Sequence, residues 1–383
     1  MIILIIWFNK IIKNYLMKYL LIILLFVHGF IHLFGFAKAF GLAQMSRINT
    51  EISRTQGVFW FITFVLFSFA GEALFSNNAK WYQIAFLAVF VSVFLIIITW
   101  QDTKYGIIPN VIILSIAILS AFSHNFNTKV EKEISKIINP TEKYAIRKTE
   151  LASLPYPVSK WLVRTGILEK SAISVVRLKQ TAKMKLSKEQ KHWYNAYAEQ
   201  YFTIEKPAFI WKVELNMNPF IKVSGRDKFN NGKGEMLIKL FSTFKVINEK
   251  GKKIDESTMQ RYLAEIVWFP SAALNPYIKW QEIDSLSAKA TMSYNGTNAT
   301  GIFYFNKEGD FVKFKCFRYK DNTSEAKKYE WIVDVVKYAE FNGVRVPAKT
   351  ELSWILESGV WTWLIIEVSE IHYDFDKQIL GSI

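Results

Sequence analysis

The chain has 383 residues, a formal net charge of +15 and a single cysteine, Cys316. Its charges are spread unevenly, because residues 1–127 hold eight Lys/Arg and three Asp/Glu while residues 128–383 hold 40 and 30. One cysteine excludes a disulfide within the chain and a thiolate metal cluster. The lysines are interleaved with glutamates and accompany no nucleic-acid-binding motif. We therefore expect no nucleic-acid partner and regard anionic lipid headgroups as the better electrostatic partner.

Four segments are long and apolar enough to cross a bilayer, which takes roughly 17–25 mostly apolar residues. They are predicted at about 19–40, 57–75, 82–100 and 105–122. Tryptophan and tyrosine residues lie near their ends, as interfacial aromatics do. Residues 1–127 are therefore predicted to form a four-helix transmembrane block in contact with the lipid bilayer.

The orientation of this block depends on its loop charges, because Lys and Arg favour the cytoplasmic side. The first and third loops between the spans carry four basic residues: Lys38, Arg47, Arg54 and Lys104. Lysines before the first span argue the opposite, but only if translation starts at Met1 rather than at Met17, and that choice stays open. We expect a protein of the bacterial inner (cytoplasmic) membrane whose second part lies outside the cytoplasm.

Three ionisable side chains fall inside the predicted spans: His28 and His32, one helical turn apart, and Glu72. Such residues are costly in a membrane and often mark haem, metal or proton paths. A redox site would need a facing histidine, for which His124 is the nearest candidate, and a metal would need a third ligand. Structural hydrogen bonding is the alternative that we favour, so we expect no cofactor and no metal.

Residues 128–153 are predicted to be a polar linker, and residues 154–383 a β-rich soluble domain. Large apolar residues alternate with polar ones along 209–217, which is typical of a half-buried antiparallel strand. Asn-Gly pairs at 231–232, 295–296 and 342–343 indicate tight hairpin turns. We count about ten strands. A short helix is expected from Pro157 to Arg164.

One clear amphipathic helix interrupts the strands, with Asp255 as its expected N-cap and Pro270 as its stop. Arg261 and Glu265 are expected to pair on the helix face away from the apolar stripe. The predicted fold class is thus a four-helix transmembrane block plus an α+β soluble domain, in which a strongly curved antiparallel sheet wraps on one or two helices. The interior is either a filled core or an apolar pocket.

The search for chemistry finds no metalloprotease, nucleophile-elbow, P-loop or dinucleotide-binding motif. Cys316 alternates with apolar residues and is interpreted as a small core residue. An enzyme is therefore neither indicated nor excluded.

Several stretches together resemble an uncharacterised bacterial family, classed as a domain of unknown function and often attached to membrane segments. The resemblance covers about residues 150–375. It rests on Leu154–Val158, Gln200–Phe202 with Phe209–Trp211, Asp227 before Gly232–Gly234, and most specifically Arg261–Pro270. A looser similarity, at the level of fold, is to the lipoprotein carriers of the bacterial envelope, whose curved sheet and helical lid hold acyl chains. The family resemblance implies no catalytic residue.

The reading that we favour is a membrane-tethered domain that binds a lipid or another hydrophobic molecule. Its expected ligand-binding residues are Phe209, Trp211, Val213, Tyr262, Leu263 and Ile266. One alternative is an envelope enzyme with Arg261 and Glu265 as a polar site. Another is a structural or sensory membrane module that acts through His28 and His32.

Overall fold

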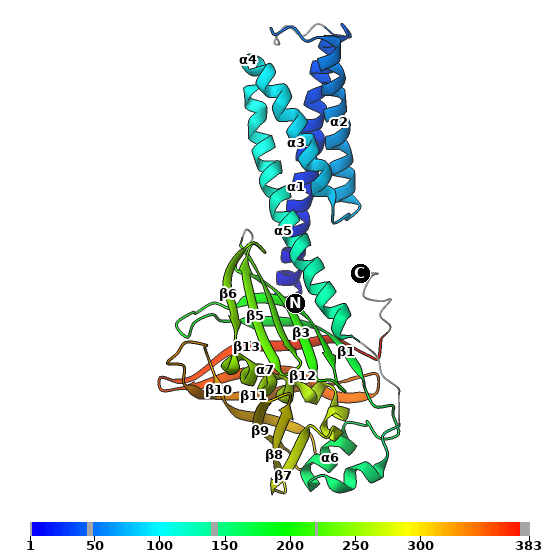
Figure 1. Cartoon of the computed structure of the whole chain (residues 1–383). Helices are drawn as coiled ribbons and strands as arrows, with labels where there is room; N and C mark the ends of the chain where they lie inside the picture. The colour runs from blue at the N-terminus through cyan, green and yellow to red at the C-terminus, as the bar shows by residue number, and fades with distance from the viewer. Residues whose placement is uncertain (1, 44–48, 139–144, 219–220, 376–383) are drawn as a thin grey trace. The chain divides into compact units, whose positions relative to one another are not determined.

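The computed structural model describes residues 2–43, 49–138, 145–218 and 221–375 (Figure 1). The chain divides into two compact units, Met1–Thr128 and Lys129–Ile383. The first unit is built of helices, and the second holds all the strands. Each unit is described by itself below.

The helices of the first unit are α1 (Ile2–Ala39), α2 (Arg54–Phe75), α3 (Trp81–Ile98), α4 (Trp100–Thr103), η1 (Lys104–Gly106) and the start of α5 (Ile107–Ile137). Four helical segments are long and apolar enough to cross a membrane: Leu16–Ala39, Arg54–Phe75, Trp81–Ile98 and Trp100–Ile137. The expectation of four such helices is confirmed. A capping box formed by Ser53 and Gln56 begins α2, since each side chain accepts a hydrogen bond from the backbone of the other residue.

The start of the second unit is the end of α5. Val130, Ile134 and Ile138 recur at helical spacing and are buried. This segment also forms an ion pair with the outer face of the sheet, in which Glu133 pairs with Arg226 at 3.2 Å. The first residues of the expected polar linker are thus helical and packed, and the short η2 (Lys148–Ser153) follows. The domain bounds 1–127, 128–153 and 154–383 stay a prediction.

The second unit contains one antiparallel sheet of thirteen strands, with two helices, α6 (Tyr156–Arg164) and α7 (Lys252–Glu265). The first six strands are β1 (Val175–Met184), β2 (Tyr194–Thr203), β3 (Ala208–Asn216), β4 (Lys222–Asn230), β5 (Lys233–Leu240) and β6 (Phe244–Lys250). The other seven are β7 (Ile278–Asp284), β8 (Ser287–Tyr294), β9 (Thr297–Phe305), β10 (Phe311–Tyr319), β11 (Lys328–Phe341), β12 (Val344–Leu356) and β13 (Gly359–Tyr373).

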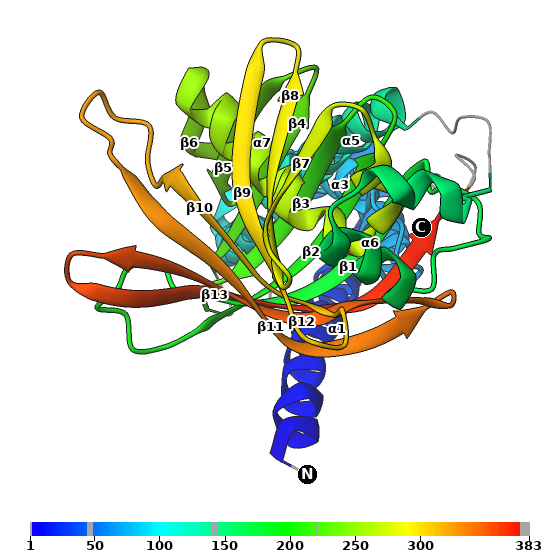
Figure 2. The same ribbon diagram turned by 90° about the horizontal axis from the view of Figure 1, so that it is seen from below.

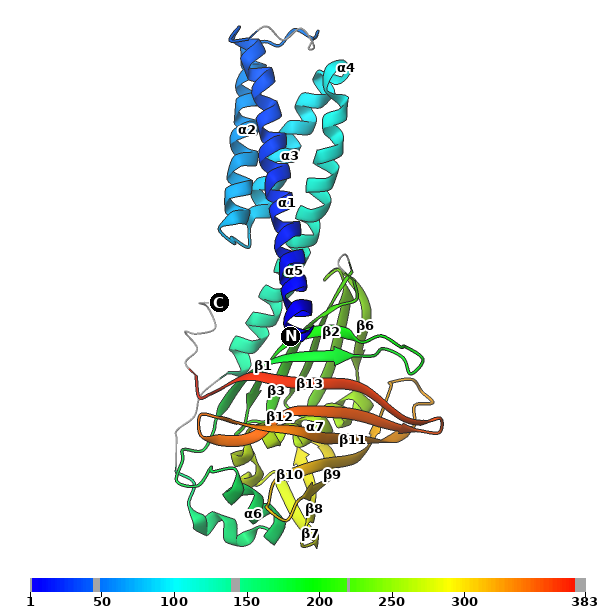
Figure 3. The ribbon, with the colours of Figure 1, turned by 180° about the vertical axis from the view of Figure 1, so that it is seen from behind.

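The strand order is β6-β5-β4-β3-β2-β1-β13-β12-β11-β10-β9-β8-β7. Each half is a meander of hairpins, and the first strand pairs with the last in the middle of the sheet. The two edges, β6 and β7, are joined along the chain by α7 and the short helices η3 (Ile266–Trp268) and η4 (Pro270–Leu274). The sheet curls around α7, as Figures 2 and 3 show, so the predicted fold class is confirmed.

Some details differ from the sequence expectation. The sheet has more strands than the ten counted, because edge strands such as β6 and β7 are mostly exposed and lack a clear alternation. The hairpin turns are confirmed, since Asn231, Asn295 and Asn342 and the glycines that follow them all have positive φ. The expected short helix at 157–164 is confirmed as α6.

The start of α7 was placed wrongly by the sequence. The helix begins at Lys252, after Gly251 at φ +117°, and Asp255 lies within its first turn. The carboxylate of Asp255 instead accepts a hydrogen bond from the backbone N–H of Gly234 at 2.8 Å and pairs with Lys233 at 3.0 Å. A residue that looks like a helix cap therefore holds the helix against β5.

The core of the second unit fills the concave side of the sheet. Along β1 to β3 the inward positions alternate strictly, and facing residues such as Phe202 and Phe209 stand directly opposite each other. Helix α7 contacts β4, β5 and β6 on one side and β8, β9 and β10 on the other. The largest fully buried side chains of this core are Trp161, Trp331, Tyr262, Phe202, Phe209, Phe229, Phe269, Phe303, Phe311 and Phe314.

We expect Gly234→Ala to destabilise the second unit by about 1–3 kcal/mol, the usual cost of overpacking. A Cβ at this position would lie 2.6 Å from the backbone oxygen of Ile254, which cannot move without shifting α7 from β5. Urea unfolding of the full chain in detergent, followed by tryptophan fluorescence, measures this cost.

Gly301→Ala is the matched control, because the three atoms nearest to its Cβ would all belong to the ring of Phe314. Phe314→Leu can relieve that clash. The double variant should therefore lose less stability than the sum of the losses of the two single variants. No such relief exists for Gly234. An unchanged stability of Gly234→Ala would show that α7 does not approach β5 this closely.

Candidate functional site

Two charged side chains of α7 point into the concave side of the sheet rather than toward solvent. Arg261 donates from Nε to Glu265 Oε1 at 2.8 Å and from Nη1 to Asp227 Oδ2, on β4, at 2.9 Å. The sequence correctly paired Arg261 with Glu265 but placed the pair on the wrong face of the helix. The apolar stripe and the ion pair share the buried side, because the sheet curls around α7 and covers most of its circumference.

Two glutamines of the sheet continue this arrangement. Gln200 donates to Glu265 Oε2 at 2.7 Å, and Gln180 accepts from the indole N–H of Trp211 at 3.0 Å. Strand register explains the meeting, because Gln200 and Asp227 both stand directly opposite Trp211, on the two strands beside it. We call these residues the buried polar network: Gln180, Gln200, Trp211, Asp227, Arg261 and Glu265.

Burial governs the electrostatics of the network. Loss of hydration raises the pKa of both Asp227 and Glu265, and the positive charge of Arg261 opposes the shift in each case. The guanidinium of Arg261 also lies over the ring of Trp211, with its Cζ 4.6 Å from the ring centroid. Every charged group of the network thus has a hydrogen-bonded partner of opposite charge, which is the condition for keeping charges inside a protein.

A second arginine lies beside the network. Arg318, on β10, donates from Nε to the backbone oxygen of Ser257 at 3.1 Å and lies over the rings of Trp331 and Trp354, 4.7 and 5.9 Å from their centroids. Burial lowers the pKa of its guanidinium to about 10, so it is a cation at neutral pH. The sequence gave no reason to single out Arg318, because it sits in an ordinary alternating strand.

No histidine or cysteine belongs to the buried polar network. His192 and His372 are exposed, and burial raises the pKa of the Cys316 thiol to about 12, which keeps it protonated. The expectation that Cys316 is a core residue is confirmed. Among residues that the structure describes, no group of three or more His, Cys, Asp or Glu could hold a metal ion. The carboxylates converge on an arginine and not on a nucleophile, so the arrangement anchors a helix.

Residues 144–366 match the family described as a family of unknown function, DUF6544. The chain belongs to this family. The matched residues are more than half of the chain, and the resemblance noted from the sequence is confirmed. All six residues of the buried polar network lie within this DUF6544 region.

Two further comparisons were informative to different degrees. No curated protein matches the chain. A crystal structure of a LolA superfamily protein from Nitrosomonas europaea matches with 7% sequence identity and a TM-score of 0.32. That match covers 54% of this chain and 90% of the other.

The apolar residues predicted to bind a ligand lie in the packed part of the DUF6544 region. Phe209, Tyr262, Leu263 and Ile266 have no exposed surface, and Val213 and Trp211 have at most 8%. The hydroxyl of Tyr262 donates to a backbone oxygen of β2 at 2.9 Å, which ties α7 to the sheet once more. These side chains fill the space between α7 and the sheet, so a ligand there would have to displace them. Their part in ligand binding stays a prediction.

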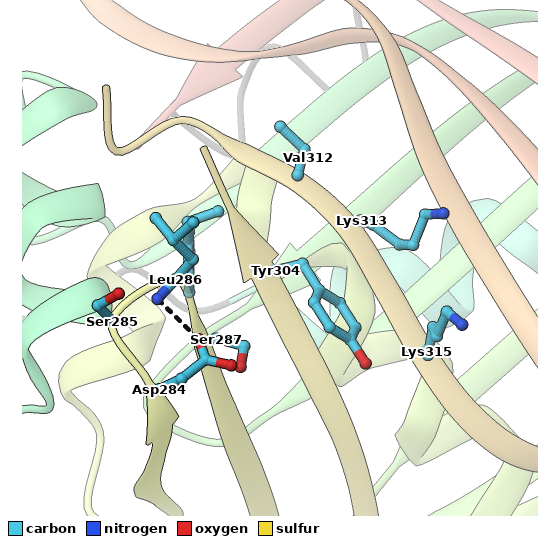
Figure 4. Close-up of a pocket in the computed structure, with 9 residues that line it drawn as sticks. Asp284, Ser285, Leu286, Ser287, Tyr304, Val312, Lys313 and Lys315 are labelled. Atoms are coloured by element: carbon cyan, nitrogen blue, oxygen red, sulfur yellow. Dashed lines mark hydrogen bonds between the residues drawn. The ribbon is translucent and has the colours of Figure 1, made fainter. Parts of the chain in front are cut away.

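A surface pocket of about 600 Å³ lies elsewhere, beside the β7–β8 turn (Figure 4). Its lining includes Asp284 and Leu286 of the turn, whose carboxylate and backbone N–H are joined at 2.8 Å, and Tyr304, Lys313 and Lys315 of β9 and β10. Phe303 and Phe314 fill the core, so their neighbours Tyr304, Lys313 and Lys315 point to the opposite, outer face. This pocket is therefore separate from the buried polar network.

In the helical unit, the structure brings both histidines into one polar chain. His32 Nε2 and Asn110 Nδ2 both bond Ser92 Oγ, at 2.9 and 2.8 Å, and His28 Nε2 bonds Asn110 Oδ1 at 3.0 Å. Ser92 and Asn110 were missed by the sequence reasoning, although each is a polar residue inside an apolar run. Glu72 is on the exposed surface of α2 and lies apart from this chain.

We expect Arg261→Met to destabilise the second unit by about 3–5 kcal/mol, because it leaves two buried carboxylates without their counter-ion. Methionine keeps the length and apolar bulk of the side chain, so packing loss is small. Thermal and urea unfolding of the full chain in detergent give the change in the free energy of unfolding.

Lys179→Met serves as the control, since Lys179 and Glu370 form an exposed ion pair at 2.9 Å. Removing an exposed pair should cost less than about 1 kcal/mol. Equal effects of the two substitutions would contradict the anchoring role of Arg261.

Proposed function

We propose that the DUF6544 region is a membrane-attached binding unit that takes up a lipid or another hydrophobic molecule at one end of its concave face. The observation that carries this proposal is a set of partly exposed apolar side chains packed against the core at the end of the sheet where the β1–β2 and β12–β13 turns lie. We call this set the aromatic rim: Met184, Tyr194, Met217, Leu356, Trp361 and Trp363.

The rim belongs to strands that are not among the main contacts of α7. Helix α7 lies against β4 to β6 and β8 to β10, whereas the rim residues come mainly from β1, β2, β12 and β13. The two turns at this end are joined by a hydrogen bond from Lys188 Nζ to Ser358 Oγ at 2.9 Å. An apolar surface that is half-exposed, rich in tryptophan and bordered by such turns is the kind of surface that marks a ligand-binding groove.

The energetics favour an acyl chain as occupant. Each buried methylene contributes roughly 0.8 kcal/mol, so even a partly enclosed chain of about ten carbons offsets the cost of association. Four helices able to span a membrane precede the DUF6544 region. Attachment to a bilayer keeps such a unit next to a reservoir of lipids, which raises the effective concentration of the ligand.

The sequence placed the ligand between α7 and the sheet, whereas the site proposed here is the aromatic rim. Of the residues expected to bind the ligand, Trp211 and Val213 are the least enclosed, and the others support the wall on which the ligand lies. Arg261 and Glu265 fix that wall through the buried polar network. His28 and His32 hold the helices of the first unit together through Asn110 and Ser92, respectively.

For the location of the chain we propose the bacterial inner membrane, with the DUF6544 region outside the cytoplasm. Basic residues in the loops between the spans support that orientation, as the positive-inside rule requires.

Reporter fusions test the orientation. A periplasmic reporter joined after Asn127 should be active, and a cytoplasmic reporter at the same position should be inactive. Fusions after Asn78, between α2 and α3, should show the same side as fusions after Asn127, because two spans separate the two sites. Activity of only the cytoplasmic reporter after Asn127 would reverse the orientation while leaving the four spans in place.

Binding is tested with a fatty acid that carries bromine atoms, which quench tryptophan fluorescence on contact. The full chain in nanodiscs of saturated lipid should show saturable quenching, and Trp361→Leu should lose a large part of it. Trp280→Leu is the matched control, because Trp280 packs against the same core from the far edge strand β7.

Quenching that does not saturate, or that Trp280→Leu reduces as much as Trp361→Leu, would contradict binding at the rim. Tryptophans of the helical unit contribute a constant background that the comparison of variants removes.

A further inference from the structure

Three tryptophans form a row on the concave face that ends in the aromatic rim, at Trp361. Trp331 on β11 stands directly opposite Trp354 on β12, which in turn stands directly opposite Trp361 on β13. The first two rings have centroids 6.5 Å apart. We call Trp331, Trp354 and Trp361 the tryptophan row. Antiparallel register places the three side chains on one face, since directly opposite residues point the same way.

Hydrogen-bond donors without acceptors accumulate in and beside this row. Within the described part of the chain, the buried indole N–H groups of Trp331, Trp361 and Trp363 have no hydrogen-bond partner. Trp331 is 1% exposed, so bulk water does not satisfy its N–H group in this structure. Buried polar groups are almost always paired, and a group left unpaired points to a missing partner. All of the unpaired atoms on β11 and β13 are donors.

The guanidinium of Arg318 adds to this surplus of donors. It lies over the rings of Trp331 and Trp354, and its hydrogen bond to the backbone oxygen of Ser257 uses Nε alone. Its two terminal nitrogens donate to no residue that the structure describes. The carboxylates whose charges act on Arg318 are Asp227 and Glu265, and both are already bonded to Arg261.

A second cation lies at the other end of the row. Lys320, two residues beyond Arg318 on the same side of the chain, places its Nζ 5.4 Å from the ring centroid of Trp361. Unpaired N–H donors and two cations beside one apolar surface match a ligand that carries negatively charged oxygen atoms. A neutral hydrocarbon would leave these donors unpaired.

We propose that Arg318 and the unpaired indole N–H groups of Trp331 and Trp361 bind the oxyanion of an amphiphile, a carboxylate or a phosphate, whose chain lies on the aromatic rim. This inference rests on the proposed function and names the chemical class of its ligand. The planar fork of an arginine matches the two oxygens of a carboxylate or phosphate, and its stacking on two tryptophans holds the fork in place. The rim supplies affinity, and Arg318 supplies selectivity for the charged end.

The test compares oleate with oleyl alcohol, which share one chain and differ in the charged group. Full-length protein in nanodiscs should bind oleate at least about tenfold more tightly than the alcohol, a typical contribution of a charge-assisted contact. Arg318→Met should weaken oleate binding until the two affinities are within about twofold of each other and leave the alcohol unchanged. Trp331→Phe, which keeps an aromatic ring but removes the indole N–H together with part of the bicyclic ring, should lower the preference in part.

Two further variants separate binding from folding. Arg318→Lys keeps the charge but not the fork, and should retain an intermediate preference for oleate. Lys313→Met, on the outer face of the same strand, should behave as wild type because Lys313 pairs with Asp334 there. The melting temperature of each variant shows whether it is folded. If Arg318→Met is not folded, Arg318→Lys provides the test.

The outcomes distinguish the two proposals. Equal affinities of the wild-type protein for oleate and oleyl alcohol would overturn the oxyanion site and leave the rim as the ligand site. Failure of both ligands to bind would overturn the proposed function itself. Inorganic phosphate alone could also bind as tightly as oleate and with the same dependence on Arg318. That result would show a site for a free oxyanion and would overturn the assignment of an amphiphile as the ligand. Oleoyl lysophosphatidic acid that binds like oleate supports the phosphate headgroup as well.

Discussion

The docking of α7 between the two halves of the sheet is the constraint on which the second unit depends. The sheet is two meanders joined at β1 and β13, so its edges would be far apart without an element that links them. Three kinds of contact fix the helix: Asp255 on the backbone N–H of Gly234, Arg261 on Asp227, and the apolar stripe on the core. A glycine at position 234 is needed because the backbone of α7 passes where a Cβ would lie.

The buried polar network has a cost and a benefit that follow from this docking. Two carboxylates and an arginine inside a core add little stability compared with apolar residues of the same volume. They do specify one position of α7, because only one rotation and translation of the helix pairs Arg261 with Asp227 and Glu265 with Gln200. The same docking fills the space beneath the helix with aromatic rings. The partly buried residues of the aromatic rim pack against the edge of this core.

The two units use buried polar groups in related ways. In the helical unit, His28, His32, Ser92 and Asn110 form a chain of hydrogen bonds among apolar side chains, in which Nδ1 of His28 has no partner. In the DUF6544 region the charged groups of the buried polar network are paired with one another. The tryptophan row differs, because the indole N–H groups of Trp331 and Trp361 have no acceptor among the residues that the structure describes. That imbalance, rather than a cavity, is what indicates a site for a ligand.

The sequence alone determined the classes of structure: apolar runs fixed the four helices, period-two alternation indicated antiparallel strands, and Asn-Gly pairs located hairpin turns. These signals are local, and local physics decides them. The strand order, the start of α7 and the inward side of Arg261 were decided by tertiary packing, since a sheet that surrounds a helix removes its solvent face. Gln180, Gln200 and Asp227 lie on β1, β2 and β4, and Arg318 lies much later in the sequence, on β10. Only the register of the folded sheet brings them together, so no local pattern could have identified the site.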